Sequence, residues 1–192
     1  MPFIIVFFVA FITSLIVSNR SNNKRTGKNG ENALEKLVSS VPGYGTTLKN
    51  CSVKKSNGSS LEIDLILVHS TGLYVFETKN LRGWIFGNEK QEHWTQVIGK
   101  NRFQFYNPYR QNAHIIANLK KGLPDSNVPI IGHVVFSNDC VFKDVTINSD
   151  NWGPLHYKDI KRVLKKEIEN ATSALSNQEV DNLYSVLVDM VK

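Results

Sequence analysis

Hydrophobic residues along this chain follow several different spacings, and each spacing predicts a different kind of element. From Gly30 to Ser40 they recur at helical spacing, and Pro42-Gly43 ends the predicted helix. Leu61 to His69 and Leu73 to Lys79 are the strongest strand candidates. Because only the Ser70-Thr71-Gly72 turn separates these two segments, we expect them to pair as a hairpin.

Alternation in the first of these strands predicts which side chains share a face of the sheet. Thr46 to Val53 is a weaker strand candidate that precedes it. The two faces expected for the first strong strand are Leu61, Ile63, Leu65 and Leu67 on one side, and Glu62, Asp64 and Ile66 on the other.

The second half of the chain adds strands and helices in an order that defines the fold class. The predicted elements are a hairpin over Trp84 to Val97, a helix from Asn107-Pro108 to Gly122, a buried strand over Val128 to Phe136 and, after a loop, helices over Tyr157 to Ile168 and from Ser176 onward. Proline near a helix start and a Ser-x-x-Glu capping box support the two helix starts. The order predicts an α/β domain with a mixed central sheet flanked by helices.

An apolar segment precedes this domain. Residues Pro2 to Val17 carry no charge and are rich in Phe, Ile and Val. With the next two residues the run approaches the ~20 residues that span a bilayer, so we expect an N-terminal transmembrane helix with residues 2–18 in the membrane. No basic residue precedes the run and Val17-Ser18-Asn19 is a poor cleavage site, which argues against a cleaved signal peptide. Positive charges from Arg20 to Lys28 predict a single-pass cell-membrane protein whose main domain is cytoplasmic.

These patterns divide the chain into four parts. We expect a transmembrane anchor at 1–19, a basic linker at 20–28, a core at 29–145 and a C-terminal helical extension of the same domain at 146–192. The net charge of +6 suits either a polyanionic partner or an anionic membrane surface. Two cysteines without Cys-x-x-Cys spacing argue against a zinc knuckle. They could form one disulfide, but we interpret them as free, packed thiols.

Three charged residues stand out on the predicted hairpin. Glu77 and Lys79 lie two apart on one strand, so their side chains leave the same face, and Asp64 on the neighbouring strand reaches that face if the register allows. Charged groups on an otherwise apolar strand are costly unless they are paired or functional. A divalent cation relieves the repulsion between two close carboxylates and activates a bound water, which is the chemistry of phosphodiester hydrolysis. The alternative is a salt-bridged polar face of a sheet.

Asp64, Glu77 and Lys79 belong to an ordered series of motifs, and this series resembles the pattern of a known family. The motifs are Gly27-Lys28-Asn29-Gly30-Glu31, Glu62-Ile63-Asp64-Leu65-Ile66-Leu67-Val68, Gly72-Leu73-Tyr74-Val75-Phe76-Glu77-Thr78-Lys79-Asn80, Gly83-Trp84, Trp94, and Asn107-Pro108 with Gln111. Between Thr26 and Phe136 the chain resembles the nuclease-related domain (NERD) family of the PD-(D/E)xK nuclease superfamily. The resemblance implies a restriction-endonuclease-like fold and a site for Mg²⁺ or Mn²⁺.

The resemblance also assigns roles to residues. Asp64, Glu77 and the backbone carbonyl of Thr78 match the metal ligands of the superfamily. Glu31 matches a carboxylate on the first helix that commonly completes the site, although a carboxylate is also favourable in the first turn of any helix. Ile63 departs from the superfamily pattern, which often has Pro before the Asp.

Two further residues match parts of the family's site. Lys79 matches the residue that assists the attacking water, and Gln111 matches a polar residue beside the catalytic sheet, although a plain helix-surface amide is equally expected there. Aromatic residues between these two positions would suit either base stacking or packing in the core, and the basic residues there would suit either phosphate contacts or a solvated surface.

We therefore expect a metal-dependent nuclease-like domain, anchored in the membrane, that cleaves nucleic acid, either DNA or RNA, with DNA the preferred substrate. The alternative is a non-catalytic module that tethers nucleic acid at the membrane through the same basic, aromatic surface. A membrane scaffold for another protein would leave the grouped charged residues unexplained.

Overall fold

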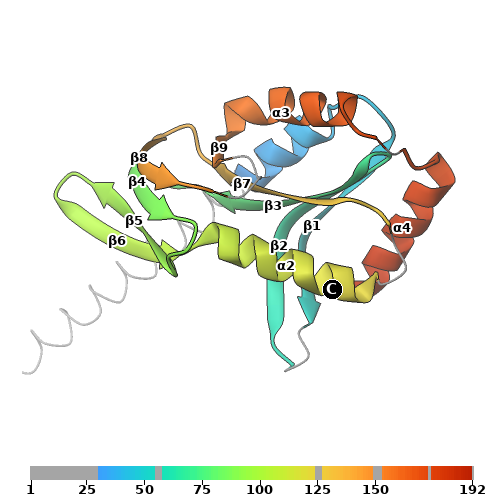
Figure 1. Cartoon of the computed structure of the whole chain (residues 1–192), viewed down its shortest axis with the longest axis horizontal. Coiled ribbons are helices and arrows are strands. Elements are labelled where there is room, and N and C mark those ends of the chain that lie inside the picture. Colours follow the sequence, from blue (N-terminus) through green and yellow to red (C-terminus); the bar gives the residue numbers. More distant parts are fainter. Residues whose placement is uncertain (1–29, 55–57, 124–126, 149–152, 173, 192) are drawn as a thin grey trace, which may run out of the picture.

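The computed structural model describes residues 30–191, apart from 55–57, 124–126, 149–152 and 173. Within that part of the chain the strands form two sheets, with the orders β1-β2-β3-β7-β9 and β6-β5-β4-β8 (Figure 1). The first sheet consists of β1 (Gly45–Lys54), β2 (Ser60–His69), β3 (Gly72–Lys79), β7 (Ile130–Phe136) and β9 (Leu155–His156). The second consists of β4 (Gly83–Asn88), β5 (His93–Ile98), β6 (Asn101–Tyr106) and β8 (Cys140–Thr146).

The first sheet is mixed, as the sequence predicts. Its β1, β2 and β3 pair antiparallel, whereas β7 pairs parallel to β3 and β9 pairs parallel to β7. The carboxyl ends of β3, β7 and β9 therefore meet at one edge, where Lys79, Phe136 and His156 lie in register. In open α/β sheets, ligands bind beyond this edge.

Helices cover both faces of this sheet (Figure 1). On one face, α2 (Pro108–Gly122) and α4 (Asn177–Met190) bury side chains such as Ile115 and Leu187 against Ile66 and Val75. On the other face, the helix over residues 30–38 and α3 (Tyr157–Glu169) pack against the opposite side of β2 and β3. The predicted mixed sheet flanked by helices is thereby confirmed, and α4 begins with the predicted capping box at Ser176.

The predicted division of β2 into two faces is wrong at one point. Ile63 packs in the α2 and α4 cluster, whereas Leu65, two positions later, packs in the cluster on the opposite face. The switch occurs at Asp64, where the opposite position in β1 is Asn50, with a left-handed φ of 51°. A non-glycine residue in this region is uncommon. The strand pair changes direction here, so simple alternation across Asp64 fails.

The second sheet is larger than expected. The predicted hairpin at Trp84 to Val97 is present as β4 and β5. We expected a loop after Phe136, but β8 forms there and pairs parallel to β4, while β6 extends the sheet beyond β5. Cys140 starts β8, and both cysteines, Cys51 and Cys140, are buried free thiols as predicted.

The proposed membrane segment, residues 2–18, lies outside the described residues. Within the described part of the chain, no helix has the length and apolar character needed to cross a bilayer.

Candidate active site

Asp64 closes the gap where β2 and β3 separate. The backbone ladder between these strands extends to the pair Leu65 and Phe76. Beyond that pair, Oδ2 of Asp64 accepts hydrogen bonds from both the backbone N–H and the hydroxyl of Thr78, each at 2.7 Å. A carboxylate thus takes the place of a backbone acceptor, which orients Asp64 toward the end of β3.

Glu77 is an almost completely buried carboxylate, with 1% of its surface exposed. Its Oε1 accepts a hydrogen bond from Nζ of Lys79, while its Oε2 is buried with no hydrogen-bond partner among the described residues. Burial raises the pKa of Glu77 to about 7; the nearby Lys79 ammonium lowers it, and the Asp64 and Glu62 carboxylates raise it. Asp64 and Glu77 therefore lie close enough to influence each other, as the hairpin predicts.

Lys79 also donates to Oε1 of Gln111, at 3.3 Å. Gln111 lies in the first turn of α2, and a buried clamp fixes where that helix begins. The side chain of Asn107 caps the helix by accepting from the N–H of Tyr109. Its amide donates to the carbonyls of Asn88, Glu89 and Gln91 in the turn of the second sheet. The Asn107-Pro108 motif thus joins the second sheet to the helix that carries Gln111.

Tyr157 is a member of this neighbourhood that sequence reasoning missed. It begins α3, directly after the β9 strand that ends the first sheet. Burial, the Asp64 carboxylate and then the Glu31 carboxylate raise the pKa of Tyr157 to about 12. Thr78 is near enough to lower this pKa, yet the buried hydroxyl has no partner in hydrogen-bond geometry within the described residues.

The residues predicted for the active site do not all lie equally close to one another. Glu77, Lys79 and Gln111 form a continuous series of contacts. Asp64 bonds to Thr78 and acts on Glu77 through its charge. Glu31, at the start of the helix over residues 30–38, acts on the site through its charge beside Tyr157. Across the described part of the chain, no group of three or more His, Cys, Asp and Glu side chains is arranged to hold a metal ion.

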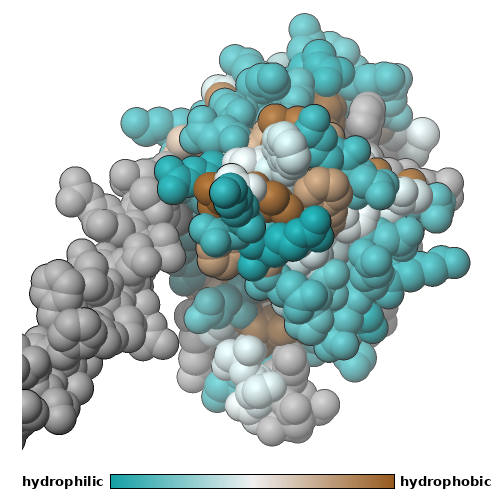
Figure 2. Space-filling model, turned by 90° about the vertical axis from the view of Figure 1, so that its left-hand side faces the viewer, coloured by the Kyte–Doolittle hydropathy of each residue, from teal (hydrophilic) through white to brown (hydrophobic). Residues whose placement is uncertain are grey.

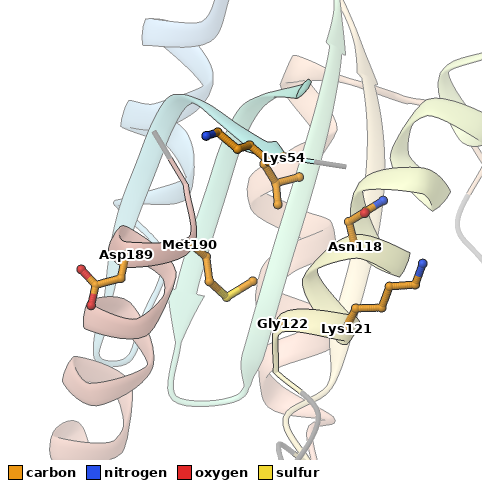
Figure 3. A pocket seen from close by; sticks show the side chains of 7 residues that line it. Lys54, Asn118, Lys121, Gly122, Asp189 and Met190 are labelled. Atoms are coloured by element: carbon orange, nitrogen blue, oxygen red, sulfur yellow. The ribbon is translucent and has the colours of Figure 1, made fainter. Parts of the chain in front are cut away.

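A separate pocket lies between the ends of β1, α2 and α4 (Figure 3). Its lining includes Lys54, Lys121, Asp189 and Met190, and it contains none of the residues predicted for catalysis. The charged edge beside Asp64, rather than this pocket, is therefore the candidate active site.

A mixed sheet with two carboxylates and a lysine at its carboxyl edge has the form of a nuclease-like domain. Comparison with known families agrees: the nuclease-related domain model matches residues 26–137, so the chain belongs to the NERD family. An uncharacterized protein of Bacillus anthracis is 33% identical over 191 residues, covering 96% of this chain and 88% of that relative. No solved structure matches the chain significantly.

Proposed function

We propose that this domain hydrolyses phosphodiester bonds in nucleic acid, DNA in preference to RNA, with the help of Mg²⁺ or Mn²⁺. The observation that carries the proposal is the convergence of Asp64, Glu77 and Lys79 at the carboxyl edge of the sheet. Membership in the nuclease-related domain family supports the reaction class.

The donor set fits a hard divalent cation. Oε2 of Glu77 is buried and has no hydrogen-bond partner among the residues that the structure describes, and a bound cation would satisfy it. In a strand the N–H and C=O of one residue point toward the same neighbour, so the Thr78 carbonyl faces the gap that Asp64 closes. Two carboxylates and a carbonyl are sufficient, because Mg²⁺ usually keeps several waters. Glu31 is the proposed additional carboxylate on the first helix.

The chain's own residues then have distinct roles. Asp64, Glu77 and the Thr78 carbonyl would hold the metal, whose chemistry is to acidify a bound water and stabilise charge on phosphoryl oxygens. Nζ of Lys79 donates to the buried Glu77 carboxylate, and from there it would orient the water and offset negative charge that develops in the reaction. Gln111 holds Lys79 from the helix side.

Loss of Asp64 tests this proposal. The purified full chain is expected to cleave DNA with Mg²⁺ or Mn²⁺ and to lose cleavage in EDTA. Asp64→Asn keeps an oxygen for Thr78 but removes the charge, and we expect activity to fall at least about 100-fold, or about 2.7 kcal/mol of barrier. Asp144→Asn, on the exposed strand β8, is the matched control. If Asp64→Asn cleaves DNA as fast as the wild type, the proposed active site is wrong.

An exposed row of side chains favours a nucleic-acid partner and supports a second candidate function. Arg102, Val97, Trp84 and Val141 pair in turn across the second sheet. We call them the Trp84 row. The Trp84 side chain is 50% exposed, and Nζ of Lys143 lies 4.8 Å from its ring centroid. Figure 2 faces this end of the molecule and shows apolar residues surrounded by hydrophilic ones.

An exposed aromatic ring with Lys143 beside it, and with Arg102 two strands away in the same row, offers a stacking surface and phosphate contacts to a nucleic-acid strand. The second candidate function is therefore nucleic-acid binding without cleavage. Salt-sensitive binding that needs no metal and survives Glu77→Gln, in a chain that cleaves nothing, would favour binding alone.

We also propose, from the sequence, that residues 2–18 anchor the protein in the cell membrane with the main domain in the cytoplasm. The division into 1–19, 20–28, 29–145 and 146–192 stays a prediction. Protease added outside intact cells should spare the main domain, whereas digestion of that domain would reverse the proposed orientation.

A further inference from the structure

The unused hydroxyl of Tyr157 lies at the same edge of the sheet as the proposed metal ligands. Strand register places His156 beside Phe136, and Phe136 beside Lys79. Tyr157 follows His156 directly, so the first residue of α3 is set at the carboxyl ends of three parallel strands. Tyr157 lies beyond residues 26–137, the part of the chain that the family model matches.

The hydroxyl occupies space that a glycine keeps open. A Cβ atom on Gly30 would lie 2.7 Å from the Tyr157 oxygen and 3.7 Å from Cγ of Asn80. The start of the first helix therefore approaches the tyrosine closely only because Gly30 has no side chain. Glu31, the next residue, lies close enough to act on the hydroxyl electrostatically, as does Asp64 from the sheet.

A buried hydroxyl without a hydrogen bond is costly. Leaving a buried donor unsatisfied costs about 1–3 kcal/mol, and such groups in folded proteins call for an explanation. Asp64, Glu31 and Thr78 all lie near Tyr157, but none of them meets the hydroxyl in hydrogen-bond geometry. A phenol that keeps its proton can donate but cannot act as a base, and phosphodiester oxygens only accept.

We propose that Tyr157 is a substrate-contact residue, whose hydroxyl donates a hydrogen bond to a non-bridging oxygen of the phosphate held at the Asp64 and Glu77 edge. This inference rests on the proposed function, because it requires a phosphate at that edge. The phosphate oxygen supplies the acceptor that the described part of the chain does not provide.

The test separates phosphate binding from metal binding and from cleavage. Thymidine 5′-monophosphate contains no phosphodiester, so its binding to the full chain with Mn²⁺ can be followed by calorimetry without turnover. We expect Tyr157→Phe to weaken this binding about 10-fold, as loss of a hydrogen bond to a charged acceptor predicts. Mn²⁺ affinity measured alone should stay within about twofold, because the hydroxyl donates to phosphate rather than to a metal ligand.

Tyr184→Phe, on α4, is the matched control and should change neither affinity. On DNA, Tyr157→Phe should lower kcat/KM to a similar extent and leave the thermal unfolding midpoint unchanged or raised, since it removes an unsatisfied buried group.

Three outcomes would overturn the inference. Equal monophosphate affinity in wild type and Tyr157→Phe would show that the hydroxyl does not contact phosphate. An equal loss of Mn²⁺ affinity would show that Tyr157 positions the metal ligands instead. If the wild-type chain binds no monophosphate, there is no phosphate site for Tyr157 to contact. If the wild type binds monophosphate but cleaves no nucleic acid, the proposed hydrolysis fails while the Tyr157 contact is still decided by the binding result.

Discussion

Thr78 donates two hydrogen bonds to a single oxygen of Asp64, one from its backbone and one from its hydroxyl, each at 2.7 Å. The pair joins strands β2 and β3 at the point where their ladder ends. Because two donors fix Oδ2, the orientation of the whole carboxylate is set before any ligand arrives, which is the condition for a preorganised site.

The first prediction concerns the hydroxyl of that pair. Thr78→Val keeps the backbone donor and a similar shape but removes the second hydrogen bond. We expect cleavage to fall about 10-fold with a stability loss of about 1 kcal/mol, because one hydrogen bond to a charged acceptor is lost. Steady-state kinetics and urea unfolding measure the two effects. Thr78→Ser keeps the hydroxyl and should retain most activity, and a serine variant as poor as the valine variant would contradict this.

A second prediction follows from the raised pKa of Glu77. Burial holds this pKa at about 7, above its usual 4.5, so the folded state favours the protonated carboxyl. The resulting stabilisation is complete below about pH 4.5 and is lost as the pH rises through about 7.

In EDTA, the free energy of unfolding of wild type should therefore fall, relative to Glu77→Gln, between pH 5 and pH 8.5. The upper limit of this relative change is about 3 kcal/mol. Urea denaturation of both proteins at the two pH values measures it. A difference between the two proteins that does not change with pH would show that Glu77 does not titrate in this range.

The third prediction separates Lys79 from Gln111. Lys79→Met removes the ammonium that lowers the pKa of Glu77, so the pH profile of cleavage should shift toward alkaline values. We expect an activity loss of about 100-fold or more, since a charge beside the reacting group is removed. Gln111→Leu removes only a 3.3 Å contact to Lys79 and should cost about 3-fold to 10-fold without an alkaline shift. Equal losses in the two variants would contradict the assigned roles.

The sequence predicted the centre of the fold because its signal there is strong. Strands β2 and β3 are long apolar runs joined by a short turn, and among the charged residues that interrupt them Glu77 and Lys79 contact each other, while Asp64 lies near enough to raise the pKa of Glu77. Strand β6 was missed because nearly all of Asn101–Tyr106 is exposed, which removes the alternation that identifies a half-buried strand. The β8 segment has a similar, mostly exposed pattern.

Two features of the site depend on tertiary structure and leave no local signal. The left-handed Asn50 opposite Asp64 reverses the faces of β2, and alternation alone does not reveal such a change. Tyr157 looks like an ordinary first residue of a helix. Only the pairing of β9 with β7 brings it beside residues that lie about half the chain earlier in the sequence.

The last prediction concerns the Trp84 row, which should bind the strand whose phosphate is cleaved. Trp84→Ala removes the stacking surface, and base stacking on an aromatic side chain contributes about 1–3 kcal/mol per base. We therefore expect single-stranded DNA to bind at least about fivefold more weakly to this variant. Arg102→Ala should weaken binding and lower the slope of log affinity against log salt by about one, as loss of one phosphate contact requires.

Fluorescence anisotropy with a labelled oligonucleotide, in EDTA and over a range of salt concentrations, measures both effects on the Trp84 row. Lys161→Ala, on the exposed side of α3, changes the net charge equally and is the matched control for Arg102→Ala. If Lys161→Ala lowers the salt slope as much as Arg102→Ala does, binding follows net charge alone. The Trp84 row would then have no specific role. If it is a contact surface, removing a charge from the row must weaken DNA binding more than removing the same charge elsewhere.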